Sequence, residues 1–318
     1  MSTLPPLAPP QAEKPAAGQG PKKPAGLKAL PYALLLPASL VLILVLGYPF
    51  GRLFVLSMQK FGLKQQFGAP PDWIGLDNYT GIFQDSQFWV VLARTIGFCA
   101  AAVVLTMVLG MLVALLTRRV GRVLRMALIV SLLFAWAMPP LSATVVWQWL
   151  FDTRYGLVNW LLSQFGGDFH GHSWLSNPWS FFGVALIIVV WMGIPFVAFT
   201  LYAGLTQVPG EVLEAAELDG AGAAQRFRYV ILPFLRPVIL ILTALSVLWD
   251  LRVFTQFYVL QKAGGIARDT NVLGVYAYRL AFGENKFDVG AAVAVVMLLI
   301  TLLFTVFYLR QITRQEEL

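Results

Sequence analysis

Charged residues are scarce in this chain of 318 residues. Only 12% of them are Asp, Glu, Lys or Arg, whereas a soluble domain typically carries about 25%. A surface with so little charge cannot keep a protein of this size dispersed in water. Hydrophobic residues make up 58% of the chain, and the mean hydropathy is +0.72. The composition therefore excludes a soluble, disordered or collagen-like protein and indicates a membrane protein.

Residues that commonly hold metals or perform catalysis are also few. Cys99 is the single cysteine, so the chain forms no internal disulfide; it lies in an apolar run and is expected to be a small buried residue. His170 and His172 have no cysteine or acidic cluster at metal-ligand spacing beside them, which argues against a metal site. The sequence has no Ser/His/Asp catalytic motif and no G-x-x-x-x-G-K-[ST] nucleotide loop. We therefore expect no enzyme activity, no cofactor and no ATP hydrolysis by this chain itself.

The sequence contains several long apolar runs. A helix needs about 20 apolar residues to cross a bilayer and satisfies its own backbone groups there. Six runs are long enough, and the ten-residue alternation of a membrane barrel is absent. The sequence predicts an all-α membrane protein with six transmembrane helices, near residues 29–51, 95–117, 126–150, 181–205, 238–260 and 289–309.

The N-terminal segment differs in composition from the rest of the chain. Residues 1–28 are rich in Pro, Gly, Ala and Lys and have little apolar surface to bury, which predicts a disordered tail. The segment does not resemble a secretory signal, because the first apolar run starts too late and lacks a cleavage pattern. Residues 29–318 are predicted to form the membrane domain.

Positive charge is distributed unevenly between the two sides of the predicted spans. Among the loops and tails, 13 Lys and Arg residues lie on the side of both termini and seven on the opposite side. Cytoplasmic segments carry the excess of these residues in membrane proteins. Both termini are therefore predicted to be cytoplasmic. The net charge of +7 is explained by this orientation and does not indicate nucleic-acid binding.

The segment 208–237 is the longest predicted cytoplasmic connection, VPGEVLEAAELDGAGAAQRFRYVILPFLRP. Pro209 suits the first turn of a helix, and Gly220 and Gly222 interrupt that helix. A second helix is predicted from about Ala223, ending near Pro233. One face of this helix–turn–helix is apolar and the other charged. From these residues alone, a surface connector without a partner and a docking element fit equally well.

The spacing within this segment closely resembles the EAA loop of ATP-binding-cassette (ABC) importer permeases. The matching residues are Glu214, Ala215, Ala216, Asp219, Gly220, Phe227, Leu232, Pro233 and Pro237. Further segments resemble carbohydrate permeases of the maltose and glycerol-phosphate type, namely 74–79, 191–209, 254–271 and 276–290. The resemblance implies the fold of a type I ABC importer permease in a bacterial cell membrane.

The resemblance also implies partners and roles. In such importers the EAA helices dock in a cleft of a separate ATPase subunit. Glu214 would offer a carboxylate to a basic group of that subunit, Gly220 would permit the turn, and Leu232 and Pro233 would anchor the second helix against the spans. A second, similar permease and an extracytoplasmic solute-binding protein that delivers a sugar or oligosaccharide are also implied. The sequence does not specify which sugar is carried.

Two charges in the fifth span suggest a substrate path. Asp250 and Arg252 are costly in lipid, so they are expected either to reach water near the outer interface or to face a cavity. On one continuous helix, Arg252 and Gln256 share a face at i and i+4, joined by Trp249. The candidate residues for the path are Trp249, Asp250, Arg252, Gln256 and Tyr258.

Two other classes of protein remain as alternatives. A secondary transporter driven by an ion gradient needs intramembrane carboxylates, and Asp250 is the single candidate. That alternative also leaves the EAA-like segment unexplained. A membrane-embedded enzyme lacks a catalytic cluster.

Overall fold

The computed structural model describes residues 26–316 and divides the chain into two units, the first ending at Arg52 and the second starting at Leu53. The predicted disordered tail, residues 1–28, lies outside the described residues except for its last three, which already belong to a helix.

The first unit is a single apolar helix. It comprises α1 (Gly26–Leu42), a π-helical turn η1 (Ile43–Gly47) and the beginning of α2 (Tyr48–Ser57), which continues into the second unit. Every described side chain from Leu34 to Arg52 is exposed. A helix that is hydrophobic on all sides and buries nothing within its own chain suits a lipid environment. The predicted span 29–51 corresponds to this helix.

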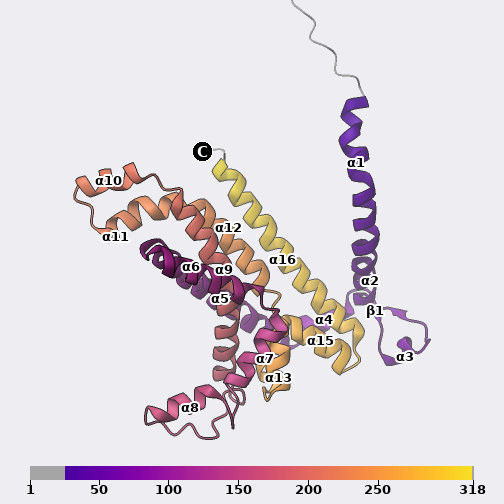
Figure 1. Cartoon of the computed structure of the whole chain (residues 1–318). Coiled ribbons are helices and arrows are strands. Elements are labelled where there is room, and N and C mark those ends of the chain that lie inside the picture. The colour runs from indigo at the N-terminus through magenta and orange to yellow at the C-terminus, as the bar shows by residue number, and fades with distance from the viewer. Residues whose placement is uncertain (1–25, 317–318) are drawn as a thin grey trace, which may run out of the picture. The chain divides into compact units, whose positions relative to one another are not determined.

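The second unit contains the remaining long helices, with short elements between them (Figure 1). The long helices are α5 (Ser86–Arg119), α6 (Arg122–Ala137), α7 (Pro140–Leu150), α9 (Pro178–Thr206), α12 (Leu232–Asp250) and α16 (Phe287–Glu316). The short elements are β1 (Gln59–Lys60), α3 (Leu63–Gln66), β2 (Asp72–Trp73), α4 (Asp77–Gln84), α8 (Leu157–Gln164), α10 (Gly210–Leu218), α11 (Ala223–Arg226), η2 (Phe227–Ile231), α13 (Thr255–Lys262), α14 (Ala267–Thr270), α15 (Leu273–Tyr278) and η3 (Arg279–Gly283). The antiparallel pair β1–β2, two residues per strand, is a small departure from an all-α fold.

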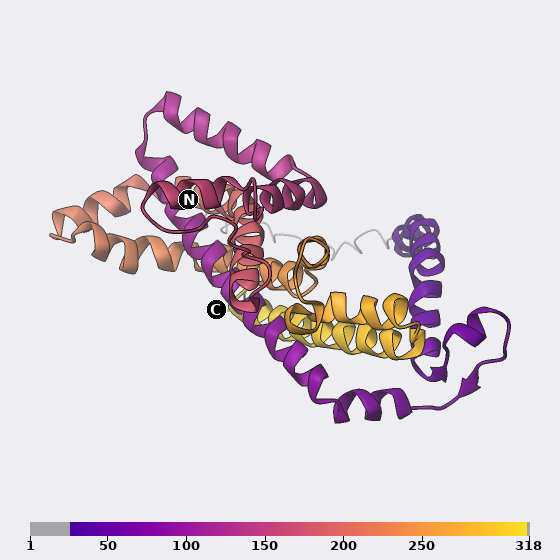
Figure 2. The same ribbon diagram turned by 90° about the horizontal axis from the view of Figure 1, so that it is seen from below.

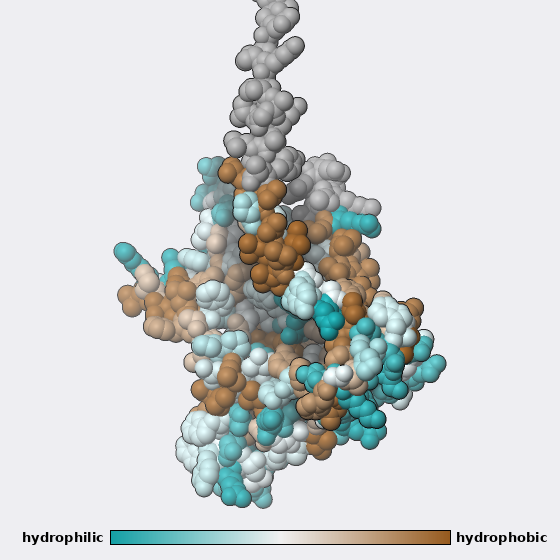
Figure 3. Space-filling model, turned by 90° about the vertical axis from the view of Figure 1, so that its right-hand side faces the viewer, coloured by the Kyte–Doolittle hydropathy of each residue, from teal (hydrophilic) through white to brown (hydrophobic). Residues whose placement is uncertain are grey.

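Five helices of the described chain are long and apolar enough to cross a membrane. A sixth crossing exists if α6 and α7, which are bent by 103° at their junction, count as one broken span. The predicted span 126–150 is therefore not one continuous helix. Pro139 and Pro140 explain the break, because a proline disfavours helical backbone at the residue before it and donates no hydrogen bond. Figure 3 shows apolar side chains exposed over broad areas of the surface, as lipid-facing helices require.

The predicted fifth span, 238–260, is also not one continuous helix. α12 ends at Asp250, and α13 starts again at Thr255 after an irregular stretch. Within this stretch the Arg252 amide donates to the carbonyl of Trp249 at 3.2 Å, while the Arg252 Nε donates to the carbonyl of Leu248 at 3.0 Å. The arginine side chain thus satisfies the carbonyl that its own amide would occupy in a continued α-helix, which permits the helix to end.

The contact between α5 and α9 is the most extensive in the second unit. At its centre Gly110 lies directly against Val197, and a Cβ at position 110 would come within 2.5 Å of the Val197 Cγ1. Small residues allow such close approach between membrane helices. Towards α12 the contact continues into a buried cluster of Ala114, Val197, Leu201, Leu205, Leu235 and Leu242.

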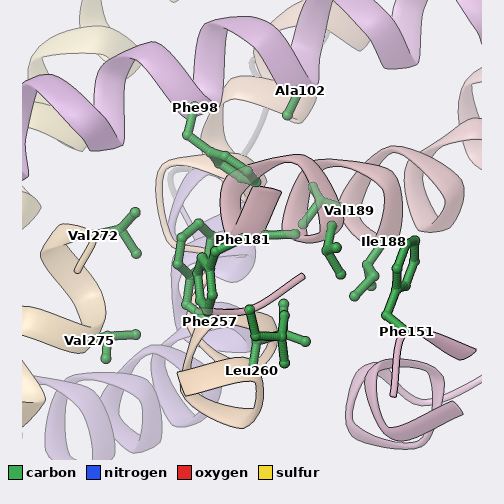
Figure 4. Close-up of a cluster of buried hydrophobic side chains, with 13 residues drawn as sticks. Phe98, Ala102, Phe151, Phe181, Ile188, Val189, Phe257, Leu260, Val272 and Val275 are labelled. Atoms are coloured by element: carbon green, nitrogen blue, oxygen red, sulfur yellow. The ribbon is translucent and has the colours of Figure 1, made fainter. Parts of the chain in front are cut away.

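A second cluster lies at the other end of the α5–α9 contact (Figure 4). Phe98 from α5 and Phe181 from α9 converge on Phe257 of α13, with ring centroids 4.9 and 5.7 Å from that of Phe257. Phe257 and Leu260 are completely buried. This burial fixes α13 in place after the irregular stretch.

α15 lies beside α16 (Figure 2), and polar contacts tie this pair to the first loop of the second unit. The Asp288 carboxylate accepts from the Phe61 amide at 3.0 Å, and the Asp288 amide donates to the Phe61 carbonyl at 3.2 Å. The Tyr276 hydroxyl donates to Asp85 at 3.2 Å. Burial, together with the Asp85 charge, raises the pKa of Tyr276 to about 12, so this hydroxyl remains a donor at neutral pH.

The α5–α9 contact predicts a sharp difference between two glycines of α5. Gly110→Ala should destabilise the protein by about 1–3 kcal/mol, because the stiff Val197 side chain cannot move away without strain. Gly97→Ala is the matched control, since a Cβ there meets nothing within 4 Å. Thermal unfolding in detergent measures both, and equal melting temperatures for the two variants would refute this packing.

Candidate functional site

The segment 210–231 forms a helical hairpin that projects from the second unit (Figures 1 and 2). α10 ends in a Schellman motif, in which Ala221 donates to the carbonyl of Ala216 at 2.9 Å and Gly220 donates to that of Glu217 at 3.0 Å. Gly220 has φ +82°, a conformation that side-chain-bearing residues rarely adopt. The predicted turn at Gly220 is confirmed.

Side-chain contacts beyond the turn cap the second helix of the hairpin and join it to the first. The Gln225 Oε1 accepts from the Gly222 amide at 2.8 Å and so satisfies an N-terminal donor of α11. Arg226 of α11 forms an ion pair with Glu217 of α10. The two short helices are therefore held together by the hairpin's own residues.

The second helix of the hairpin does not end near Pro233, contrary to the sequence prediction. α11 continues through the π-helical turn η2 directly into α12. In this turn the Leu232 amide donates to the carbonyl of Phe227, five residues back. The wider turn shifts the hydrogen-bond register just before Pro233, which then lies in the first turn of α12, where a missing amide donor is tolerated.

The EAA-like residues differ in exposure. Glu214, Ala215, Asp219 and Gly220 are exposed, while Ala216 and Phe227 are half-buried. The four exposed residues lie on α10 and at the turn that follows it, where they are available to a partner.

The predicted anchors Leu232 and Pro233 are exposed. Leu235 is completely buried instead, in the cluster with Leu205 of α9, and anchors the start of α12. Leu218, which the sequence analysis did not single out, is 89% exposed at the tip of the hairpin.

A cavity of about 510 Å³ lies at the other end of α12. Four of the five predicted path residues line it: Trp249, Asp250, Arg252 and Gln256. α9 contributes Met192 and Phe196, and the α6–α7 break contributes Met138 and Pro140. Both helix interruptions therefore border the same cavity.

The path residues do not share one helix face, because the helix is interrupted between them. The Trp249 ring packs edge-on against Phe196, with centroids 5.2 Å apart. Gln256 is buried on α13 and donates to the Met192 sulfur at 3.5 Å. Within residues 26–316 no ion pair joins Asp250 to Arg252. The expected shared helix face is therefore wrong, although tertiary structure brings Trp249, Arg252 and Gln256 to one cavity.

Tyr258 does not line the cavity. Its ring stacks on Phe254 at 5.4 Å and meets Tyr278 edge-on at 5.3 Å. The two histidines are likewise separate from the cavity, and the described part of the chain contains no group of three or more potential metal ligands.

The long apolar helices are those of a multi-pass membrane protein. The chain belongs to the family of binding-protein-dependent transport system inner membrane components, which matches residues 106–316. This membership confirms the resemblance based on the EAA-like residues. It also confirms that the chain is a transport component of the inner membrane and not an enzyme, which excludes the enzyme alternative.

Individual relatives and a solved structure agree with this assignment. The chain is 45% identical to the diacetylchitobiose uptake system permease protein DasB of Streptomyces coelicolor, over 90% of this chain and 88% of that protein. It is 32% identical to the sulfoquinovosyl glycerol transport system permease protein SmoG of Agrobacterium fabrum, over 92% of each. A bacterial ABC transporter that imports the acidic polysaccharide alginate has the same fold, with a TM-score of 0.75 and 22% identity over 91% of this chain and 96% of that one.

Proposed function

We propose that this chain is one of two similar permease subunits of an ABC importer that takes up a sugar or oligosaccharide. A solute-binding protein outside the membrane delivers the sugar, and a separate ATPase subunit supplies the energy. The projecting hairpin is the observation that carries this proposal, since a secondary transporter driven by an ion gradient has no use for it. The two named relatives are permeases for diacetylchitobiose uptake and sulfoquinovosyl glycerol transport. Diacetylchitobiose is the first sugar to test, because the diacetylchitobiose permease is the more similar of the two at 45% identity.

The proposed topology has six crossings and cytoplasmic termini. The α6–α7 pair would make one broken crossing. The distribution of Lys and Arg supports the orientation. So does the second unit itself, in which the hairpin and the C-terminal end of α16 lie towards one end and α8 towards the other (Figure 1).

In the proposed mechanism the hairpin docks in the ATPase and moves with it. Its internal ion pair and Schellman motif link its two short helices, and its second helix is continuous with α12. Glu214 offers a carboxylate to a basic group on the ATPase, and Ala215 and Ala216 allow close approach. Asp219 and Gly220 form the tip of the hairpin.

The cavity at the end of α12 is the proposed sugar path. Sugars bind between aromatic faces and polar groups that match their hydroxyls, within a mostly apolar wall. Trp249 supplies an aromatic face, and Asp250, Arg252 and Gln256 supply polar groups. Tyr258 lies outside the lining and is not part of the proposed path.

Labelling of single cysteines tests the orientation. In a Cys99→Ser background, Phe165→Cys after α8 should react with an impermeant thiol reagent on intact cells, and Leu218→Cys in the hairpin should not. Both side chains are more than four-fifths exposed, at 86% and 89%, so accessibility alone does not separate them. In permeabilised cells that express the permease without the ATPase, both should react, and the reverse pattern on intact cells would overturn the topology.

Charge reversal tests the docking. Glu214→Lys should abolish uptake and strip the ATPase from the purified permease, because placing like charges at an interface costs about 2–5 kcal/mol. Glu211→Lys makes the same change in the first turn of α10, outside the EAA pattern, and should retain both. Normal uptake together with normal ATPase retention in Glu214→Lys would show that the hairpin does not dock there.

Removal of an aromatic face tests the sugar path. Trp249→Ala should raise the KM for sugar uptake about fivefold, since an aromatic face contributes about 1 kcal/mol. Gln256→Ala should impair uptake or alter sugar preference at unchanged abundance in the membrane. Tyr258→Phe is the control outside the cavity. Normal uptake and selectivity in both alanine variants would place the binding face elsewhere.

A further inference from the structure

A second cavity, of about 270 Å³, lies where the end of α5 meets the hairpin. Its wall has two chemically different parts. Three arginines form one part: Arg118 and Arg119 from α5 and Arg226 from α11. Apolar side chains form the other: Leu115, Leu213, Ala223 and Ile231.

The side chains of Arg118 and Arg119 are not needed to satisfy the backbone carbonyls at the C-terminal end of α5. The carbonyls at a helix C-terminus attract cations, but here Arg125 occupies them. The Arg125 Nε donates to the carbonyl of Thr117 at 3.0 Å, and its Nη2 donates to that of Val120 at 3.0 Å. Because Arg125 satisfies these carbonyls, the side chains of Arg118 and Arg119 remain available to bind an anion.

The three arginines differ in how far their charge is already balanced. Arg226 is paired with Glu217. Among the described residues, no carboxylate pairs with Arg118 or Arg119. The cavity thus has two unpaired guanidinium groups at its wall, and guanidinium groups bind phosphate oxygens with matched geometry.

An apolar stripe leads away from the arginines along α5. Val108, Leu112, Leu115 and Arg119 follow one another at spacings of four, three and four residues, which places them on one face of the helix. Val108 and Leu112 are 51% and 55% exposed. A ligand that reaches both the arginines and this stripe has an anionic head and an apolar chain.

We propose that this cavity binds the phosphodiester headgroup of an anionic phospholipid, with an acyl chain along Leu115, Leu112 and Val108. Basic pockets between membrane helices on the cytoplasmic side are suited to such headgroups. The inference rests on the proposed orientation, which places the cavity at the cytoplasmic leaflet. Since Leu213 and Ile231 belong to the hairpin region, the bound lipid contacts both α5 and the element that docks the ATPase.

Native mass spectrometry of the purified full-length chain tests the proposal, with phosphatidylglycerol titrated against phosphatidylethanolamine. The wild-type chain should retain phosphatidylglycerol selectively. The double variant Arg118→Gln/Arg119→Gln should bind it about 25-fold more weakly, at about fivefold for each arginine. Arg122→Gln/Arg236→Gln is the matched control, because it removes the same charge from exposed positions outside the cavity and should retain the lipid. The lipid titrations do not require the ATPase, so lipid binding is measured independently of docking, and ATPase retention is measured separately.

Three outcomes would overturn the proposal. The first is equal phosphatidylglycerol binding by the two double variants. The second is displacement of the lipid by inorganic phosphate at equal concentration, which would assign the cavity to free phosphate. The third is loss of ATPase retention in Arg118→Gln/Arg119→Gln with lipid binding intact, which would assign the arginines to the ATPase interface.

Discussion

The close contact between α5 and α9 is the constraint on which the rest of the second unit depends. Inside a bilayer, lipid competes with protein for apolar surface, so helices associate by tight packing rather than by exclusion of water. Gly110 makes that packing possible against Val197. The two ends of the contact carry the two buried clusters, one of which anchors Leu235 below the hairpin and the other Phe257 beside the cavity. Both candidate sites are therefore positioned by one helix pair.

α12 links these two sites. It begins where the π-helical turn leaves the hairpin, and its last residue, Asp250, lines the cavity. A helix of 19 residues spans about 28 Å and transmits displacement along its axis as a stiff body. The irregular stretch after Asp250 separates α12 from α13, which the buried Phe257 and Leu260 hold in place. In the proposed importer, displacement of the hairpin would thus be carried by α12 to its junction with α13, where the cavity lies.

The prolines are the positions at which the structure departs most from the sequence expectations. Pro233 was expected to end a helix, but a wide turn before it and the burial of Leu235 after it keep the helix continuous. Pro139 and Pro140 were expected to lie within a span, yet the chain bends there by 103°. A proline removes the same donor in both cases. Whether the helix continues depends on how the freed carbonyls and the following side chains are accommodated, which the local sequence does not specify.

The sequence by itself determined that the chain is helical and lies in a membrane, because bilayer thickness and backbone hydrogen bonding impose long apolar runs on any such protein. It also determined the hairpin, because the EAA-like spacing and the left-handed turn at Gly220 are local properties of a short segment. Tertiary structure alone decided which residues line the cavity. Trp249, Asp250, Arg252 and Gln256 meet there although the helix breaks between them, since the burial of Phe257 against α5 and α9 positions α13. Such a position results from contacts between residues far apart in the chain, and no periodicity within one segment encodes it.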